Sequence, residues 1–486
     1  MSELYYESAI TQAQWIKEKK ISARELLELH FSRVDAVNPI INAIIWEDRE
    51  RAWELAGQQD ALLAKQGVDG LGSLYGVPIT VKEAFDLVGS PSTWGNPALA
   101  ENRPDTDADV VQRYKSAGAN IFGKTNVPLN LVEWQSFNEI YGTTLNPWDL
   151  TRTPGGSSGG SSAALATGMT ALEAGSDIGS SIRNPAHYCG VFGLKPTWNV
   201  IPLRGHMPPG WVSDIDIAVT GPMARSAQDL NLGFNVLVGP DQFGKNAWRT
   251  HCPDDRRVRL KEFRVAIKLD DGASPVDKTY IEQLALFADK LAAEGATVVF
   301  DCEPDIQSQE YFDLYLKLLG AARSVGVTDA EIEQMRNIPR EEDNPESRKL
   351  LDRRIEGMVM SHGEWQVTHN ERRKARLKFD RFFEDYDILL CPVCASTAFP
   401  IDEMGGRYER KITVNDRKVG EVLQMFWAGY SGVVGLPSAV GPISLLGGLP
   451  VGYQAIAGHG KDRTALAFSM AVEREIGGFT PPPDFI

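Results

Sequence analysis

The sequence predicts an α/β protein in which a mixed sheet carries helices on both faces, because strand-like and helix-like segments alternate along the chain. Residues 263–267 form an apolar strand pattern, residues 277–294 carry apolar side chains at helical spacing, and residues 296–300 form another strand pattern. An earlier unit repeats this rhythm, with strands at residues 77–81 and 120–123 on either side of a helix. Such β-α-β units build parallel or mixed sheets covered by helices.

The other elements follow from local patterns. Residues 108–116 predict the helix of the earlier unit, with Gly118 as its stop, and three later segments predict strands, at 386–393, 438–443 and 451–457. We therefore expect a sheet assembled from segments spread over most of the chain.

The N-terminus is predicted to be helical. Two capping boxes, Thr11 to Gln14 and Ser22 to Glu25, can satisfy the free amides at a helix start. The second helix is expected to stop before Asn38-Pro39, since the residue before a proline disfavours the helical conformation.

We expect one domain over residues 1–486. Within it, residues 1–70 form a helical N-terminal segment, residues 70–230 a core that carries the most distinctive motifs, and residues 305–385 a charged helical segment that borders the core. The mixed charge runs of this last segment, such as residues 340–343 and 372–376, are interpreted as solvated helix faces, although the segment could also border a substrate entrance.

Composition excludes several classes of protein. The 486 residues carry a formal net charge of −15, which disfavours nucleic acid and anionic membrane as partners. No apolar run approaches the ~18 residues of a membrane span. Five cysteines on so long a chain argue against a disulfide framework. We expect a cytoplasmic enzyme.

The cysteines and histidines show no metal-binding spacing. Cys391 and Cys394 have the spacing of a redox motif, but they end an apolar strand rather than open a helix, so a structural role is expected. We expect neither a metal nor a cofactor.

A glycine-serine segment at residues 155–160 is the first candidate for chemistry. It matches G-x-S-x-G at Ser157 and again at Ser158, the pattern of a hydrolase nucleophile elbow. An elbow needs a strand directly before the serine and an acid and a histidine after it, whereas residues 146–154 are turn-like. The preceding segment therefore argues against an elbow.

A second glycine-serine segment, residues 175–183, follows a short predicted strand at 170–176. Its amides, including those of Ile178, Gly179 and Ser180, could converge on a developing oxyanion beside Ser181. A purely structural turn at a strand end is an equally good interpretation of this segment alone.

A serine needs a base to remove its proton as it attacks. The candidate is Lys82, at the carboxyl end of the strand at 77–81, where sheet enzymes place chemistry. To accept a proton near neutral pH, Lys82 must be buried so that its pKa falls from a reference value of about 10.4.

These segments together resemble the amidase signature family. The resemblance rests on Pro-Gly-Gly-Ser-Ser-Gly-Gly-Ser at 154–161, Gly-Ser-Asp-Ile-Gly-Ser-Ser-Ile-Arg-Asn-Pro-Ala at 175–186 and Cys-Gly-Val-Phe-Gly-Leu-Lys-Pro-Thr at 189–197, and it is strongest over residues 70–230. It implies an α/β/α sandwich in which Lys82 is the base, Ser157 the bridging serine and Ser181 the nucleophile. It also implies a cis peptide bond between Gly156 and Ser157.

Two positions depart from the family pattern. Ser180 stands where the family usually has glycine, and serine there would cost about 1–2 kcal/mol if the backbone were left-handed. Glu83 follows the lysine, where aspartate is common, and we interpret this change as local and harmless.

The resemblance implies an amidohydrolase that cleaves a neutral or aryl carboxamide of small size through an acyl-enzyme. Esters and carbamates are further candidate substrates, because the same oxyanion donors serve all three. His206 and Trp211 either edge the substrate pocket or pack within their loop. The sequence leaves the physiological substrate open, and also the oligomeric state, for which a homodimer is one option.

Two other functions are weighed against this one. The family includes the A subunit of the tRNA-dependent amidotransferase, which passes ammonia to a partner protein, but no glutamine-recognition stretch is apparent before Tyr386. A non-catalytic binding protein is disfavoured because the lysine and both serines are intact.

Overall fold

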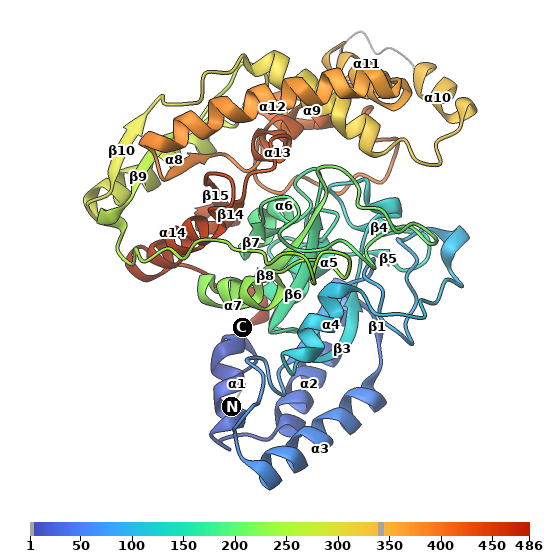
Figure 1. Cartoon of the computed structure of the whole chain (residues 1–486), viewed down its shortest axis with the longest axis vertical. Helices are drawn as coiled ribbons and strands as arrows, with labels where there is room; N and C mark the ends of the chain where they lie inside the picture. The colour runs from blue at the N-terminus through green and yellow to red at the C-terminus, as the bar shows by residue number, and fades with distance from the viewer. Residues whose placement is uncertain (1–3, 339–344) are drawn as a thin grey trace.

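A mixed eight-stranded sheet forms the centre of the computed structural model, which describes residues 4–338 and 345–486 (Figure 1). β9 pairs in parallel with both β10 and β11, whereas the remaining neighbours pair antiparallel. The predicted mixed sheet is therefore confirmed. In order across the sheet, the strands are β10 (Thr297–Phe300), β9 (Arg264–Ile267), β11 (Ile388–Cys391), β15 (Leu449–Ile456), β14 (Ser438–Leu446), β7 (Phe192–Lys195), β8 (Val219–Ala224) and β6 (Leu172–Asp177).

A three-stranded sheet lies next to β6. Its strands are β1 (Ile44–Glu47), β3 (Asn120–Thr125) and β2 (Pro78–Lys82), in that order. The Thr80 amide donates to Thr170 Oγ1 at 2.9 Å, and the Thr80 hydroxyl donates to the Glu173 carboxylate at 2.5 Å. These bonds hold β2 beside β6.

The helices lie on both sides of this framework, as predicted. In Figure 1, α9, α11, α12 and α13 lie at the top and α1, α2 and α3 at the bottom. The helices are α1 (Ala9–Lys17), α2 (Ala23–Ile41), α3 (Arg49–Gln66), α4 (Asp109–Ser116), α5 (Gly159–Ala166), α6 (Arg183–Cys189), α7 (Ala227–Leu237), α8 (Lys278–Ala293), α9 (Ser308–Ala322), α10 (Asp329–Arg336), α11 (Pro345–Val359), α12 (His362–Asp385), α13 (Met425–Gly432) and α14 (Asp462–Glu475).

Two short hairpins complete the strands. They are formed by β4 (Phe137–Asn138) with β5 (Gly142–Thr143) and by β12 (Lys411–Val414) with β13 (Arg417–Gly420). The two ends of the described chain meet, since the Tyr6 hydroxyl donates to the Phe485 carbonyl at 2.7 Å. No helix within residues 4–338 or 345–486 is long and apolar enough to cross a membrane.

The N-terminal helices correct two predictions. The Ser22 capping box is present. The Thr11 box is not, because α1 begins at Ala9, three residues before the start at Gln12 that a Thr11 cap would give. Ser8 caps this helix, and the Asp229 carboxylate accepts from the amides of Ala9 and Ile10. The second helix does not stop before residue 39. Pro39 lies inside α2, where it removes a single donor, and the helix ends at Ile41, with Asn42 in the left-handed conformation as its C-cap.

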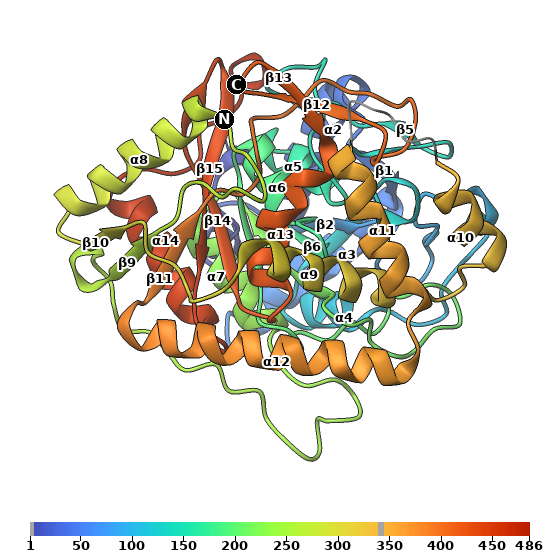
Figure 2. The same cartoon turned by 90° about the horizontal axis from the view of Figure 1, so that it is seen from above.

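The charged segment at 305–385 contains α9 to α12, as expected; residues 339–344, including the run at 340–343, lie outside the described residues. The second run is only partly solvated, because Arg372 is buried and its guanidinium contacts Asp216 at 2.7 Å. The helices α9 and α11 approach closely at Gly320 and Gly357 (Figure 2). A Cβ atom at Gly320 would lie 2.1 Å from the Arg354 carbonyl oxygen, so this approach needs glycine.

Candidate active site

Lys82 ends β2 with its side chain fully buried. Its ammonium nitrogen lies 2.7 Å from Ser157 Oγ, 2.9 Å from Ser176 Oγ and 3.0 Å from Ser158 Oγ. Burial lowers the pKa of Lys82 to about 7, although Asp177, Glu173 and Glu83 oppose that change. Because the three contacts are hydroxyl oxygens rather than carboxylates, nothing in direct contact requires the lysine to stay charged.

Ser157 lies on the loop before α5, and the peptide bond between Gly156 and Ser157 is cis, as the resemblance implied. Asn184 of α6 holds this peptide, since it accepts from the Gly156 amide at 3.1 Å and donates to the Gly156 carbonyl at 2.7 Å. Only isolated bridges occur over residues 146–154, so no strand leads into the serine. The geometry of a nucleophile elbow is therefore not met.

The turn that carries Ser181 is organised by Asp177, the last residue of β6. The Asp177 carboxylate accepts from the amides of Ser180 at 2.9 Å and Ile182 at 3.1 Å. Arg183 donates to both oxygens of the same carboxylate, at 2.8 and 2.9 Å, and both side chains are fully buried. Burial alone would raise the pKa of Asp177, but Arg183 holds it below its ordinary value.

The two glycine-serine segments meet at the site. The Ser158 amide donates to the Ser181 carbonyl at 3.1 Å, which fixes the second loop against the first. Ser157 and Ser181 line the same cavity, but no hydrogen bond joins their hydroxyl groups, and Ser181 Oγ has no partner among the described residues. Catalytic hydrogen bonds are often long before substrate binds, so a substrate that enters this cavity would reach both serines.

Three amides were predicted to face an oxyanion, and the structure separates them. Those of Ile178 and Gly179 have no acceptor among the described residues, while their carbonyl oxygens are held by Tyr315 at 2.9 Å and Trp134 at 2.7 Å. The third amide, that of Ser180, is engaged by Asp177. The first two are therefore the available donors.

Ser180 occupies the position at which the sequence predicted strain. Its φ is 73°, in the left-handed region, and its hydroxyl is buried without a hydrogen-bond partner among the described residues. Both features cost free energy, because a Cβ atom disfavours this backbone conformation and a buried hydroxyl loses its contacts with water.

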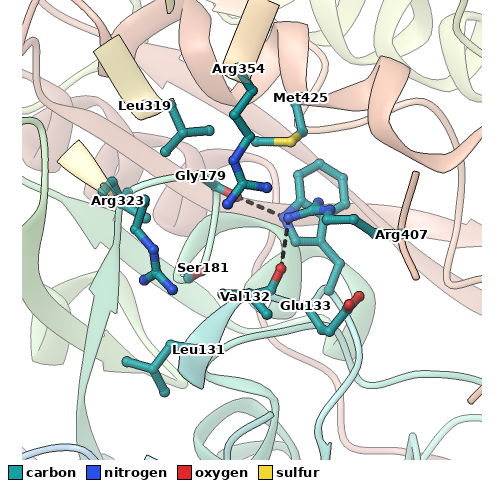
Figure 3. A pocket seen from close by; sticks show the side chains of 12 residues that line it. Leu131, Val132, Glu133, Gly179, Ser181, Leu319, Arg323, Arg354, Arg407 and Met425 are labelled. Atoms are coloured by element: carbon teal, nitrogen blue, oxygen red, sulfur yellow. Dashed lines mark hydrogen bonds between the residues drawn. The ribbon is translucent and has the colours of Figure 1, made fainter. Parts of the chain in front are cut away.

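Two cavities flank Ser181. The first, here called the aromatic cavity, contains Ser157, Trp94 and His206, with the His206 ring stacked on Trp94 at a centroid distance of 5.4 Å. The second, here called the arginine cavity, is lined by Gly179, Ser181 and three arginines, Arg323, Arg354 and Arg407 (Figure 3). Ser181 lines both.

Of the residues predicted to edge the pocket, His206 does so, whereas Trp211 lies on an exposed loop and lines neither cavity. Cys391 and Cys394 are buried free thiols, and burial raises the pKa of each to about 12, which fits the expected structural role.

Sequence reasoning did not single out Ser176, Asp177 or the arginines. The first two precede the predicted oxyanion turn, so an acid at a strand end could have been proposed as its anchor. The arginines come from separate segments between residues 323 and 407, and no local pattern connects them.

Comparison with known proteins fits this geometry. The family model described as Amidase matches residues 25–466. The chain belongs to the amidase family. This amidase is 32% identical to an indoleacetamide hydrolase of Bradyrhizobium diazoefficiens, with 97% of this chain and 86% of the relative covered. It is also 32% identical to an acylamidase of Rhodococcus erythropolis, with 95% and 94% covered.

A further relative carries the name of an amidotransferase subunit rather than of a hydrolase. The A subunit of the glutamyl-tRNA(Gln) amidotransferase of Carboxydothermus hydrogenoformans is 30% identical, with 97% of this chain and 98% of the relative covered. Among solved structures, one reported for a protein complex that reveals the evolutionary origins of an s-triazine catabolic enzyme superposes with a TM-score of 0.80 at 27% identity, covering 98% of this chain and all of the other. The amidase is a hydrolase of carbon-nitrogen bonds other than peptide bonds.

Replacing Arg183 by methionine is expected to lower the free energy of unfolding by about 3–5 kcal/mol, because it leaves the Asp177 carboxylate buried without its cation. Urea unfolding of Arg183→Met measures this loss. The matched control is Arg152→Met, which breaks a half-exposed pair with Asp149 and should cost less than about 1 kcal/mol. Equal losses in the two variants would contradict the assigned role of the buried pair.

Ser180→Gly is expected to raise the free energy of unfolding by about 1–2 kcal/mol, because it removes the left-handed Cβ atom and the unpartnered hydroxyl together. Urea unfolding checks the stability, and amide hydrolysis should change less than about threefold. A destabilised Ser180→Gly protein would show that the serine hydroxyl contributes a contact of its own.

Proposed function

We propose that the amidase cleaves its substrate through an acyl-enzyme on Ser181, with Ser157 and Lys82 as the proton relay. As the Ser181 oxygen attacks the amide carbonyl carbon, its proton passes to Ser157, and the Ser157 proton passes to neutral Lys82. The relay then runs in reverse and protonates the leaving nitrogen as the C–N bond breaks. Water hydrolyses the resulting ester, which yields a carboxylic acid and an amine and restores the Ser181 hydroxyl.

The observation that carries this proposal is the Lys82 ammonium nitrogen, buried and 2.7 Å from Ser157 Oγ. An uncharged amine at that place can take a proton from the bridging hydroxyl without a histidine. Amides need such a relay more than esters do, because an amine leaves poorly until it is protonated.

The negative charge that develops on the carbonyl oxygen needs preorganised donors. The free amides of Ile178 and Gly179 serve this role, and their own carbonyl groups are fixed by Tyr315 and Trp134. Ser180 contributes by holding the turn through Asp177 rather than by donating to the oxyanion. Removal of one such donor typically costs about 10²–10³ in rate.

The substrate is a small-molecule amide whose apolar or aromatic group lies in the aromatic cavity. Trp94, Met207 and Ile215 line that cavity and offer apolar surface. The names of the two hydrolase relatives, on indoleacetamide and on acylamides, support an aryl or alkyl amide. Esters and carbamates share the tetrahedral chemistry and fit the same donors.

The amidotransferase subunit remains the second candidate, because a relative of that name covers nearly the whole chain. It predicts glutaminase activity and a protein partner that copurifies. A protein that hydrolyses aryl amides on its own and shows no glutaminase activity would exclude this candidate.

Ser181→Ala is expected to lower kcat/KM for a 4-nitroanilide substrate by at least ~10³-fold, because no nucleophile remains. The protein should stay folded, since Ser181 Oγ makes no hydrogen bond with a described residue. Ser213→Ala, on the exposed loop, is the matched control and should retain full activity. Fluorophosphonate labelling that persists in Ser181→Ala would refute the assignment of the nucleophile.

The pH profile should report Lys82. Since burial lowers its pKa to about 7 and only the neutral amine accepts a proton, kcat/KM is expected to rise about tenfold per pH unit below 7 and to level off above it. Lys82→Arg, which stays charged, should lose activity at every pH. A profile that is flat between pH 5 and 8 would contradict a lysine base.

A further inference from the structure

Three arginine side chains line the arginine cavity, and the proposed hydrolysis of a neutral amide uses none of them. Arg323 follows the last residue of α9, Arg354 lies in α11, and Arg407 lies on the loop before β12. Figure 3 shows their side chains around one space, with Ser181 and Gly179 beside it. The close crossing of α9 and α11 at Gly320 brings together the two elements that carry Arg323 and Arg354.

None of these three guanidinium groups forms an ion pair with a described carboxylate. Each instead donates to a neutral oxygen: Arg323 to the Asn130 carbonyl at 2.9 Å, Arg354 to the Tyr408 hydroxyl at 3.3 Å, and Arg407 to the Val132 carbonyl at 2.8 Å. Arg407 is buried, whereas Arg323 and Arg354 are half-buried. Cations that are withdrawn from water in a folded protein are ordinarily paired. The three groups therefore retain capacity for an anion.

Two of the arginines have N–H groups that find no hydrogen-bond acceptor among the described residues. Arg407 is 9% exposed, and its Nε and Nη2 atoms are buried without a hydrogen-bond partner; Arg354 Nε is in the same condition. Burial lowers the pKa of Arg323 to about 10, and the positive charges of Arg354 and Arg407 act in the same direction. Such an arrangement costs free energy unless a ligand compensates it.

The nearby acids are already engaged. Glu133 lines the arginine cavity, but its carboxylate lies 2.7 Å from Arg410, and Glu421 shares the same arginine at 3.5 Å. Burial raises the pKa of Glu421, whereas the charges of Arg407 and Arg410 lower it, so Glu421 divides its charge between these two arginines. Positive charge that no ion pair of the described residues balances therefore remains on the side of Arg323, Arg354 and Arg407.

We propose that the arginine cavity binds a carboxylate carried by the acyl part of the amide substrate. This assignment rests on the proposed function, in which Ser157 protonates the leaving amine. Ser157 lines only the aromatic cavity, so we place the amine there. Arg323 lines both cavities, whereas Arg354 and Arg407 line only the arginine cavity, so the acyl chain is placed beside these two. The planar fork of arginine matches a carboxylate, which can accept two parallel hydrogen bonds.

The substrate class that follows is the monoamide of a dicarboxylic acid. The apolar side chains of Leu131, Leu319 and Met425 also line the arginine cavity and suit the methylene groups between the amide and the carboxylate. Ser181 stands between the two cavities, so one substrate can place an aryl amine on one side and an anionic acyl chain on the other.

A pair of chromogenic substrates tests this proposal. Glutaric acid mono-4-nitroanilide carries the carboxylate, and 5-methylhexanoic acid 4-nitroanilide replaces it with a neutral group of the same shape. The wild-type amidase should prefer the first by about 10²-fold in kcat/KM. Arg354→Met and Arg407→Met should each lower kcat/KM for the carboxylate substrate by ~10–100-fold, the usual effect of losing a charged hydrogen bond, and alter the neutral substrate less than threefold.

Two further variants sharpen the test. Arg354→Lys keeps the charge without the fork and should recover part of the preference. Arg381→Met, on an exposed position of α12, should leave both substrates unaffected. Thermal unfolding of Arg407→Met should match the wild type or exceed it, because the variant removes a cation that has no ion-pair partner among the described residues.

Calorimetric binding of the glutaric anilide to Ser181→Ala separates this proposal from the proposed function. Ser181→Ala is expected to bind the glutaric anilide, and Ser181→Ala/Arg407→Met is expected to lose that binding, which would support the carboxylate subsite. If the wild-type protein hydrolyses no anilide, that result counts against the catalytic assignment and leaves the binding result standing. Hydrolysis of the neutral anilide at equal or higher kcat/KM, with no loss in the arginine variants, would overturn the subsite and leave the amidase activity standing.

Discussion

The removal of one lysine from water is the constraint on which the site depends. Lys82 sits at the end of β2, sealed between two sheets, and its neighbours are hydroxyl groups. Burial penalises its charged form, so the same packing that stabilises the sheet edge also lowers the pKa of the amine to about 7, as the proposed mechanism requires. In the proposed mechanism the fold therefore supplies the base by geometry, without a histidine.

A second buried element sets the position of Ser181, the proposed nucleophile. Asp177 and Arg183 form an ion pair with no exposure, and the carboxylate also gathers the amides that shape the turn around Ser181. A buried pair is a poor source of net stability, but it fixes geometry, since each partner is costly to leave alone. The strained Ser180 lies within this turn, where such strain is commonly stored.

Much of this could be predicted from the sequence, because local patterns dictated it. The strand at 263–267 and the Ser22 capping box depend on neighbours a few residues away, and both are present. The start of α1 could not be predicted from the chain nearby, since Asp229 holds its first amides across 220 residues. The same limit applies to the arginine cavity, whose charges come from three segments joined only by tertiary packing.

The motifs located the lysine and both serines, but they could not show which amide donors were free. That distinction depends on the Asp177 carboxylate, which takes the Ser180 amide and leaves those of Ile178 and Gly179. Lys82 itself can be observed directly by NMR titration of ¹³Cε-labelled lysine, with Lys82→Met to assign its signal among other buried lysines such as Lys124 and Lys195. The Lys82 signal is expected to titrate near pH 7. A signal that titrates above pH 10 would show a charged ammonium and contradict the mechanism.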